Sequence, residues 1–199
     1  MTSAVFPVTG NPEADALLRD DPFALVLGML LDQQVPLELA FAAPARLRAR
    51  LGPGRFDPAA VAALDPGELR AAFMQRPALH RFPAAMAERA GALAAHLVER
   101  YDGRAEQLWL RAPDGAALLA ALRELPGFGD EKARIFVAVL GKRFGVRPPG
   151  WQAACAPFDD DQPRSAADID SPEAFEQVKA WKRIMRAQGK TKQDRPDPG

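Results

Sequence analysis

The longest apolar run of the chain lies near its start and predicts a buried helix. Residues Phe23–Leu31 are apolar on every side of a helix, whereas a helix at a protein surface keeps one polar face. Asp21 and Pro22 precede the run. An aspartate there can accept bonds from the first helical amides, and proline is favoured at the first helical position. Because Pro36 disfavours helical geometry in the residue before it, the helix should end before Pro36.

The same start signal, a capping side chain followed by proline, recurs along the chain. It stands at Asn11-Pro12, Asp57-Pro58, Asp65-Pro66 and Ser171-Pro172. Helical spacing of apolar residues supports a long helix over 83–101, with Met86, Ala90, Leu93, Leu97 and Tyr101 as its buried stripe. Further helices are expected over 37–52, 115–125, 133–144 and 173–188. The pattern therefore predicts an all-α protein.

Composition and charge narrow the classes of function. Alanine occurs 39 times, and it is the residue that favours helices most. The 26 basic and 26 acidic residues cancel overall. Their distribution is uneven, because residues 123–147 carry a net charge of +3, residues 148–178 of −6 and residues 179–199 of +5. Two basic stretches thus flank an acidic one, and each is either a solvated face or a phosphate-binding surface.

Cysteine and histidine, the usual ligands of zinc and iron–sulfur sites, are scarce in this chain, and no apolar run is long enough to span a membrane. The single cysteine, Cys155, excludes an intrachain disulfide and an all-cysteine cluster, and there are only two histidines, His80 and His96. We therefore expect no metal site and no cofactor. The longest apolar run has nine residues, against about 20 needed to span a bilayer. With no targeting segment visible at the N-terminus, a cytoplasmic protein is expected.

The stretch Leu125-Pro126-Gly127-Phe128-Gly129 joins two predicted helices. Proline ends the first helix. The glycines permit a positive φ and let backbone amides approach a ligand closely. The amides at the start of the next helix suit a phosphate oxygen, and Lys132 and Arg134 follow in its first turn. The turn is either a phosphate-binding hairpin or a plain connection between helices.

Two stretches of this chain resemble the helix-hairpin-helix DNA glycosylases. One is the hairpin LPGFGDEKARIFVAVLGKRFG, and the other is DPFALVLGMLLDQQV over residues 21–35. The resemblance covers about residues 20–150. It implies a two-lobed helical bundle that binds duplex DNA containing a damaged base. It also places Gln33 and Gln34 at the gap left by a flipped base, where a side-chain amide offers donors and an acceptor. Without the resemblance, the two glutamines would simply finish a buried helix.

The chain departs from the family at two catalytic positions. Where bifunctional members carry a nucleophilic lysine, this chain has Glu131, and where the family places an aspartate it has Pro149. That aspartate stabilises positive charge on the sugar. Asp32, beside the glutamine pair, is the best replacement by position, and its alternative role is that of a solvated helix end. Glu38 and the cluster Asp159, Asp160 and Asp161 are weaker candidates. Trp151 either lines the base pocket or packs in the core, and His80 either touches DNA or is a loop histidine.

Two functions remain open from the sequence. The first is a monofunctional DNA glycosylase of base-excision repair, acting as a monomer, without cofactor, on a damaged and possibly alkylated base. The second is a non-catalytic protein that binds damaged DNA on the same fold. The expected organisation is a two-lobed domain over 1–155, an acidic loop over 156–170, a helix over 171–188 that packs on the domain, and a disordered tail over 189–199.

Overall fold

The computed structural model describes residues 5–194, and these residues form helices and no strand. The all-α class is therefore confirmed. The chain forms two compact units, as a two-lobed fold requires. Of the described residues, unit 1 comprises 5–8, 112–123 and 129–194, and unit 2 comprises 9–111 and 124–128.

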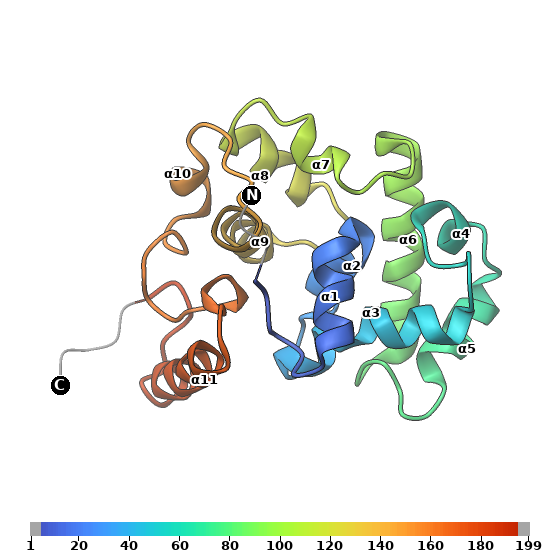
Figure 1. Cartoon of the computed structure of the whole chain (residues 1–199), viewed down its shortest axis with the longest axis horizontal. Helices are drawn as coiled ribbons and strands as arrows, with labels where there is room; N and C mark the ends of the chain where they lie inside the picture. Colours follow the sequence, from blue (N-terminus) through green and yellow to red (C-terminus); the bar gives the residue numbers. More distant parts are fainter. Residues whose placement is uncertain (1–4, 195–199) are drawn as a thin grey trace. The chain divides into compact units, whose positions relative to one another are not determined.

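Unit 2 holds seven of the described helices. They are α1 (Pro12–Asp20), α2 (Pro22–Leu31), α3 (Leu37–Leu51), α4 (Pro58–Ala62), α5 (Pro66–Met74), α6 (Pro83–Tyr101) and α7 (Gln107–Leu110). The long helix α6 runs beside α4 and α5, as the green helices of Figure 1 show. Tyr101, expected in the buried stripe of α6, is only partly buried because it is the last residue of the helix.

Helix α2 forms the centre of unit 2. All residues from Phe23 to Leu31 are buried, as the apolar run predicted. The Asp21 side chain accepts hydrogen bonds from the amides of Phe23 and Ala24, so the predicted start is also confirmed. Packing against α3 is close, because a Cβ on Gly28 would lie 2.8 Å from Cδ1 of Phe41. This rigid helix sets the position of the glutamine pair that follows it.

Unit 1 is arranged around α9. Its described helices are α8 (Gly115–Arg123), α9 (Asp130–Arg143), α10 (Trp151–Cys155), the short 3-10 helix η1 (Ala166–Asp168) and α11 (Pro172–Ala187). Residues 135–141 of α9 are buried, and α8, α10 and η1 all pack against this helix. The sequence did not predict α10 or η1, since both are short and lack an apolar repeat.

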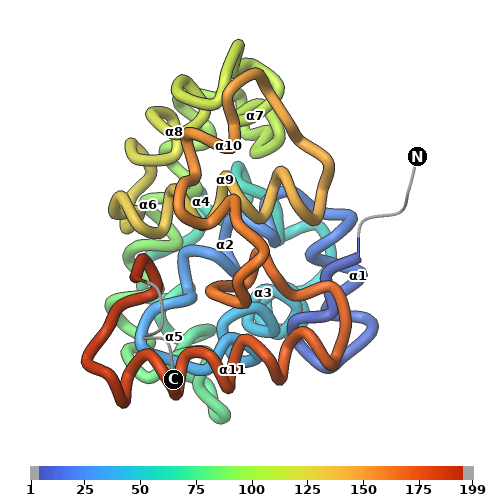
Figure 2. Tube along the Cα trace, turned by 90° about the vertical axis from the view of Figure 1, so that its left-hand side faces the viewer, coloured from blue at the N-terminus to red at the C-terminus, as the bar shows by residue number. Residues whose placement is uncertain are grey.

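The segments expected as an acidic loop and a disordered tail make specific contacts in the structure. Residues 156–170 contain η1, whose Ser165 and Asp168 form a capping box. Beyond α11 the chain turns back on itself, as the red tube of Figure 2 shows, and residues 189–194 are held by unit 1. The rest of the expected tail, 195–199, lies outside the described residues. Over residues 5–194 we find no helix with the length and apolar content of a membrane span.

Candidate nucleic-acid interface

The glutamine pair follows the C-terminal end of α2 in unit 2. Asp32 is the C-cap residue of this helix. Gln34 adopts the left-handed conformation with φ of 57°, which is uncommon outside glycine, and its side chain is exposed. The chain thus leaves the helix in a tight, non-helical turn at the residues that the resemblance assigns to DNA.

Gln33 is held at two points by the rest of unit 2. His80 Nε2 lies 2.9 Å from the Gln33 carbonyl oxygen. Because the amide of Phe82 donates to His80 Nδ1 at 3.1 Å, Nε2 is the nitrogen that carries the proton and donates. Arg89 Nη1 donates to the side-chain oxygen of Gln33 at 2.5 Å. The side-chain NH₂ group of Gln33 is left with no partner among the described residues, so its two donors can serve a ligand.

The hairpin packs directly against the helix that precedes the glutamines. Gly127 has φ of 81°, and a Cβ there would lie 2.6 Å from Cδ1 of Leu30 and 3.5 Å from Cδ of Arg89. Both the backbone conformation and the close approach therefore require glycine at this position. Arg89 bonds Gln33 and its side chain lies beside Gly127, so the two motifs of the resemblance come together inside unit 2.

Gly129 differs from Gly127, because only Gly127 adopts the positive φ that both glycines permit. Gly129 has φ of −83° as the N-cap residue of α9, and a Cβ there would meet nothing within 4 Å. Its backbone is open to solvent at a helix start that no side chain caps. Phe128, also expected at the DNA surface, is 6% exposed, and its amide donates to the Leu125 carbonyl at 3.0 Å.

The first turn of α9 carries paired charges. Arg134 donates to Asp130 at 2.8 Å and to the Ala156 carbonyl at 3.1 Å, and Arg123 also bonds Asp130. Hydrogen bonds from Arg134 and Arg123 lower the pKa of the Asp130 carboxyl. Lys132 is partly exposed in the same turn. Arg134 is therefore committed to contacts within unit 1, which sequence reasoning did not foresee.

Trp151 begins α10 and packs on α9. A Cβ on Gly141 would collide with its ring, so this glycine makes room for the indole. Arg147 lies over the ring at 5.8 Å from its centroid. Pro149, at the position of the family's aspartate, accepts a hydrogen bond from the Gly115 amide at 2.8 Å. The loop around Trp151 is thus fixed by packing of α8, α9 and α10 within unit 1.

Two carboxylates of unit 1 neutralise cations that have little exposure to solvent. Asp160 pairs with Arg164 at 2.7 Å, and Asp168 pairs with Lys142 at 2.6 Å. Burial raises the pKa of Asp168, while the Lys142 hydrogen bond opposes the rise. Asp32, in contrast, makes no hydrogen bond or ion pair with its carboxylate within residues 5–194. The described residues contain no cluster of three or more histidine, cysteine or acidic side chains able to hold a metal ion.

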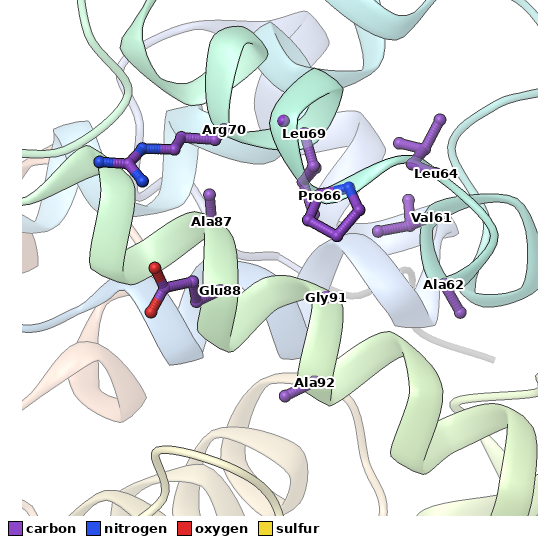
Figure 3. A pocket seen from close by; sticks show the side chains of 11 residues that line it. Val61, Ala62, Leu64, Pro66, Leu69, Arg70, Ala87, Glu88, Gly91 and Ala92 are labelled. Atoms are coloured by element: carbon purple, nitrogen blue, oxygen red, sulfur yellow. The ribbon is translucent and has the colours of Figure 1, made fainter.

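A separate cavity of about 430 Å³ opens between α4, α5 and α6 of unit 2. Val61, Leu64 and Leu69 give it a mostly apolar lining, and Arg70 and Glu88 lie at one end, as Figure 3 shows. None of the predicted site residues lines it. The sequence did not predict this cavity, because its shape depends on how three consecutive helices pack against one another.

Comparison with known proteins finds a likeness in structure and none in sequence. No protein-family model matches the sequence, and no curated protein matches it. A chain from a solved structure, described as a trapped endonuclease III–DNA covalent intermediate in an estranged-adenine complex, is similar to 83% of this chain and 72% of its own length. The two share 18% sequence identity with a TM-score of 0.46.

Proposed function

We propose that this protein binds duplex DNA at a damaged base and hydrolyses the bond between that base and its sugar. The observation that carries the proposal is the junction in unit 2, where Arg89 bonds Gln33 and its side chain also lies beside Gly127 of the hairpin. Gln33, whose amide donors have no partner within residues 5–194, and Gly127 of the hairpin turn thus lie beside the same arginine within unit 2. Both are features that a protein reading an unpaired base needs.

Each group has a defined task in this proposal. The NH₂ group of Gln33 donates to base edges exposed by flipping, and Gln34 extends that contact. The open backbone at Gly129 and the first amides of α9 bind a phosphate. The bond between the sugar carbon and the base breaks, water adds to the sugar carbon, and the released base takes up the proton that water loses. The carboxylate of Asp32 stabilises the positive charge that develops on the sugar. No cofactor takes part, and the protein acts as a monomer.

The position of Asp32 supports its role. A carboxylate at a helix C-terminus faces the negative end of the helix dipole, which costs about 0.3–1 kcal/mol. A charged side chain in an unfavourable position, with no partner to offset the cost, marks a candidate functional site. Trp151 is kept as a candidate wall of the base pocket.

A second function, binding of damaged DNA without catalysis, is favoured by one observation. Pro149 stands where the resemblance implies a carboxylate. Two other carboxylates of unit 1 already form ion pairs, Asp160 with Arg164 and Asp168 with Lys142. Removing one preorganised charge from such a site lowers the rate by roughly 100-fold or more. A protein that lacked this charge altogether would retain recognition and lose turnover.

A panel of duplexes, each with a single lesion, tests both functions. Base release is measured under single-turnover conditions and affinity by fluorescence anisotropy. Glycosylase function requires release from at least one lesion, whereas lesion-selective binding without release establishes the second function. Gln33→Ala should reduce lesion-selective affinity, and Gln177→Ala on the exposed side of α11 is the matched control. Absence of binding to every duplex at low salt would refute both functions.

A further inference from the structure

The basic C-terminal segment, residues 189–194, folds back after α11. Gly189 has φ of 66°, and the amide of Lys190 donates to the Met185 carbonyl at 2.8 Å. This is the pattern of hydrogen bonds by which a left-handed glycine ends a helix and reverses the chain. Figure 2 shows the chain turning back from the end of α11. The direction of the segment is therefore built into the end of the helix.

A buried arginine fixes the path of this segment. Arg164 is 1% exposed, and its guanidinium bonds the Asp160 carboxylate on one side. On the other side it donates to the carbonyl oxygens of Lys192, at 2.9 Å, and Asp194. The guanidinium also lies over the Trp181 ring, 5.4 Å from the centroid. Because a buried cation must keep its partners, the backbone of residues 192–194 is an integral part of unit 1.

The segment reaches the first turn of α9, where the hairpin ends. Lys192 Nζ lies 3.6 Å from Glu131 Oε1, and Gln193 Nε2 donates to Glu131 Oε2 at 3.4 Å. The other carboxylate of this turn, Asp130, is paired with Arg123 and Arg134. Two carboxylates that would repel a phosphate are thus matched by three cations, one of them supplied from the far end of the sequence.

We propose that residues 189–194 form part of the nucleic-acid surface, with Lys190 and Lys192 contacting DNA phosphates beside the first turn of α9. The proposal rests on the proposed function, and it assigns a role to two of the seven basic residues in the stretch 179–199, whose net charge is +5. Lys192 offsets the charge of Glu131, which would otherwise repel a phosphate, and its ammonium still has donors to offer to that phosphate. Arg164 is a positioning residue, because its hydrogen bonds hold the backbone of residues 192–194 where Lys192 reaches the first turn of α9.

The salt dependence of DNA binding tests this assignment in the full-length protein. Each phosphate contact contributes about 0.9 to the slope of log affinity against log salt concentration. The double variant Lys190→Gln, Lys192→Gln should therefore lower the slope by about 1.8. Over a fourfold range of salt, the affinity of the unmodified protein should then fall about tenfold more than that of the variant.

The control removes the same charge elsewhere. Arg183→Gln, Arg186→Gln neutralises two exposed cations on α11, and its slope should stay close to that of the unmodified protein. An unchanged slope in the lysine variant, or equal losses in both variants, would overturn the inference while leaving DNA binding intact. If the unmodified protein binds no duplex, the proposed function fails, and this inference fails with it.

Discussion

Alanine at the two hairpin glycines should give opposite results, because the two backbones differ. At Gly127 the left-handed conformation costs an alanine about 1–2 kcal/mol. Its Cβ must also displace the buried methyl of Leu30, 2.6 Å away, and overpacking of a core costs about 1–3 kcal/mol. Gly127→Ala should therefore lower the free energy of unfolding by about 2–5 kcal/mol.

At Gly129 the same methyl group meets only solvent. The φ of −83° suits any residue, and the position of the Cβ is open. Exchanging an N-cap glycine for alanine costs several tenths of a kcal/mol to about 1 kcal/mol. If a DNA phosphate approaches this backbone, however, the methyl group displaces it. Losing one hydrogen bond to a charged group, worth about 1.5 kcal/mol, would weaken binding about tenfold.

Urea denaturation followed by circular dichroism measures the first effect, and anisotropy of a labelled lesion duplex measures the second. Gly127→Ala with unchanged stability would refute the packing of the hairpin on α2. Gly129→Ala that is folded and binds as tightly as the unmodified protein would refute the approach of a phosphate at this position. The pair thus separates the structural glycine from the functional one.

Three further predictions concern single side chains. Arg89→Met should weaken lesion binding by the same factor as Gln33→Ala, and the double variant should be no weaker than either alone; additive losses in anisotropy would show that the two residues act separately. Asp32→Asn should lower the single-turnover rate of base release roughly 100-fold or more with little change in affinity, and equal rates would remove Asp32 from the mechanism. Burial raises the pKa of the Cys155 thiol from 9.0 to about 11. The thiol should therefore resist alkylation at pH 8 until urea unfolds the protein, and rapid labelling of the folded protein would contradict this. The free energy of unfolding should fall as the pH rises from 9 to 11, because the thiol of the unfolded chain loses its proton first.

The helix starts were predictable because their signals are local. At five helix starts the capping side chain accepts hydrogen bonds from the amides that follow it, as the pattern predicts. These side chains are Asn11, Asp21, Asp57, Asp65 and Ser171. A cap and its partners lie within three residues of each other, so the sequence contains the whole interaction. The apolar run of α2 was equally clear, since burial on all sides needs no knowledge of the neighbours.

The partners of the site residues were not predictable in this way. Arg89 reaches Gln33 across 56 positions, and Arg164 reaches Lys192 across 28. In the sequence such an arginine cannot be distinguished from an ordinary solvated charge. The hairpin showed the same limit, because the sequence treats its glycines alike, whereas only Gly127 faces a packed neighbour. What the sequence lacked was the pairing of distant segments, which depends on how the helices pack.

The return of residues 124–128 to unit 2 has a consequence for synthesis. A ribosome completes residues 9–111 before it makes this short segment, whose Leu125 and Phe128 are buried in the finished unit. Until then the nascent chain exposes the apolar surface that residues 124–128 cover, including the methyl of Leu30 beneath Gly127. A fragment ending at Arg111 would keep that surface bare, so it should aggregate unless a peptide spanning residues 124–128 is added in trans. Unit 2 is therefore one compact unit whose two segments are synthesised separately, with residues 112–123 of unit 1 between them.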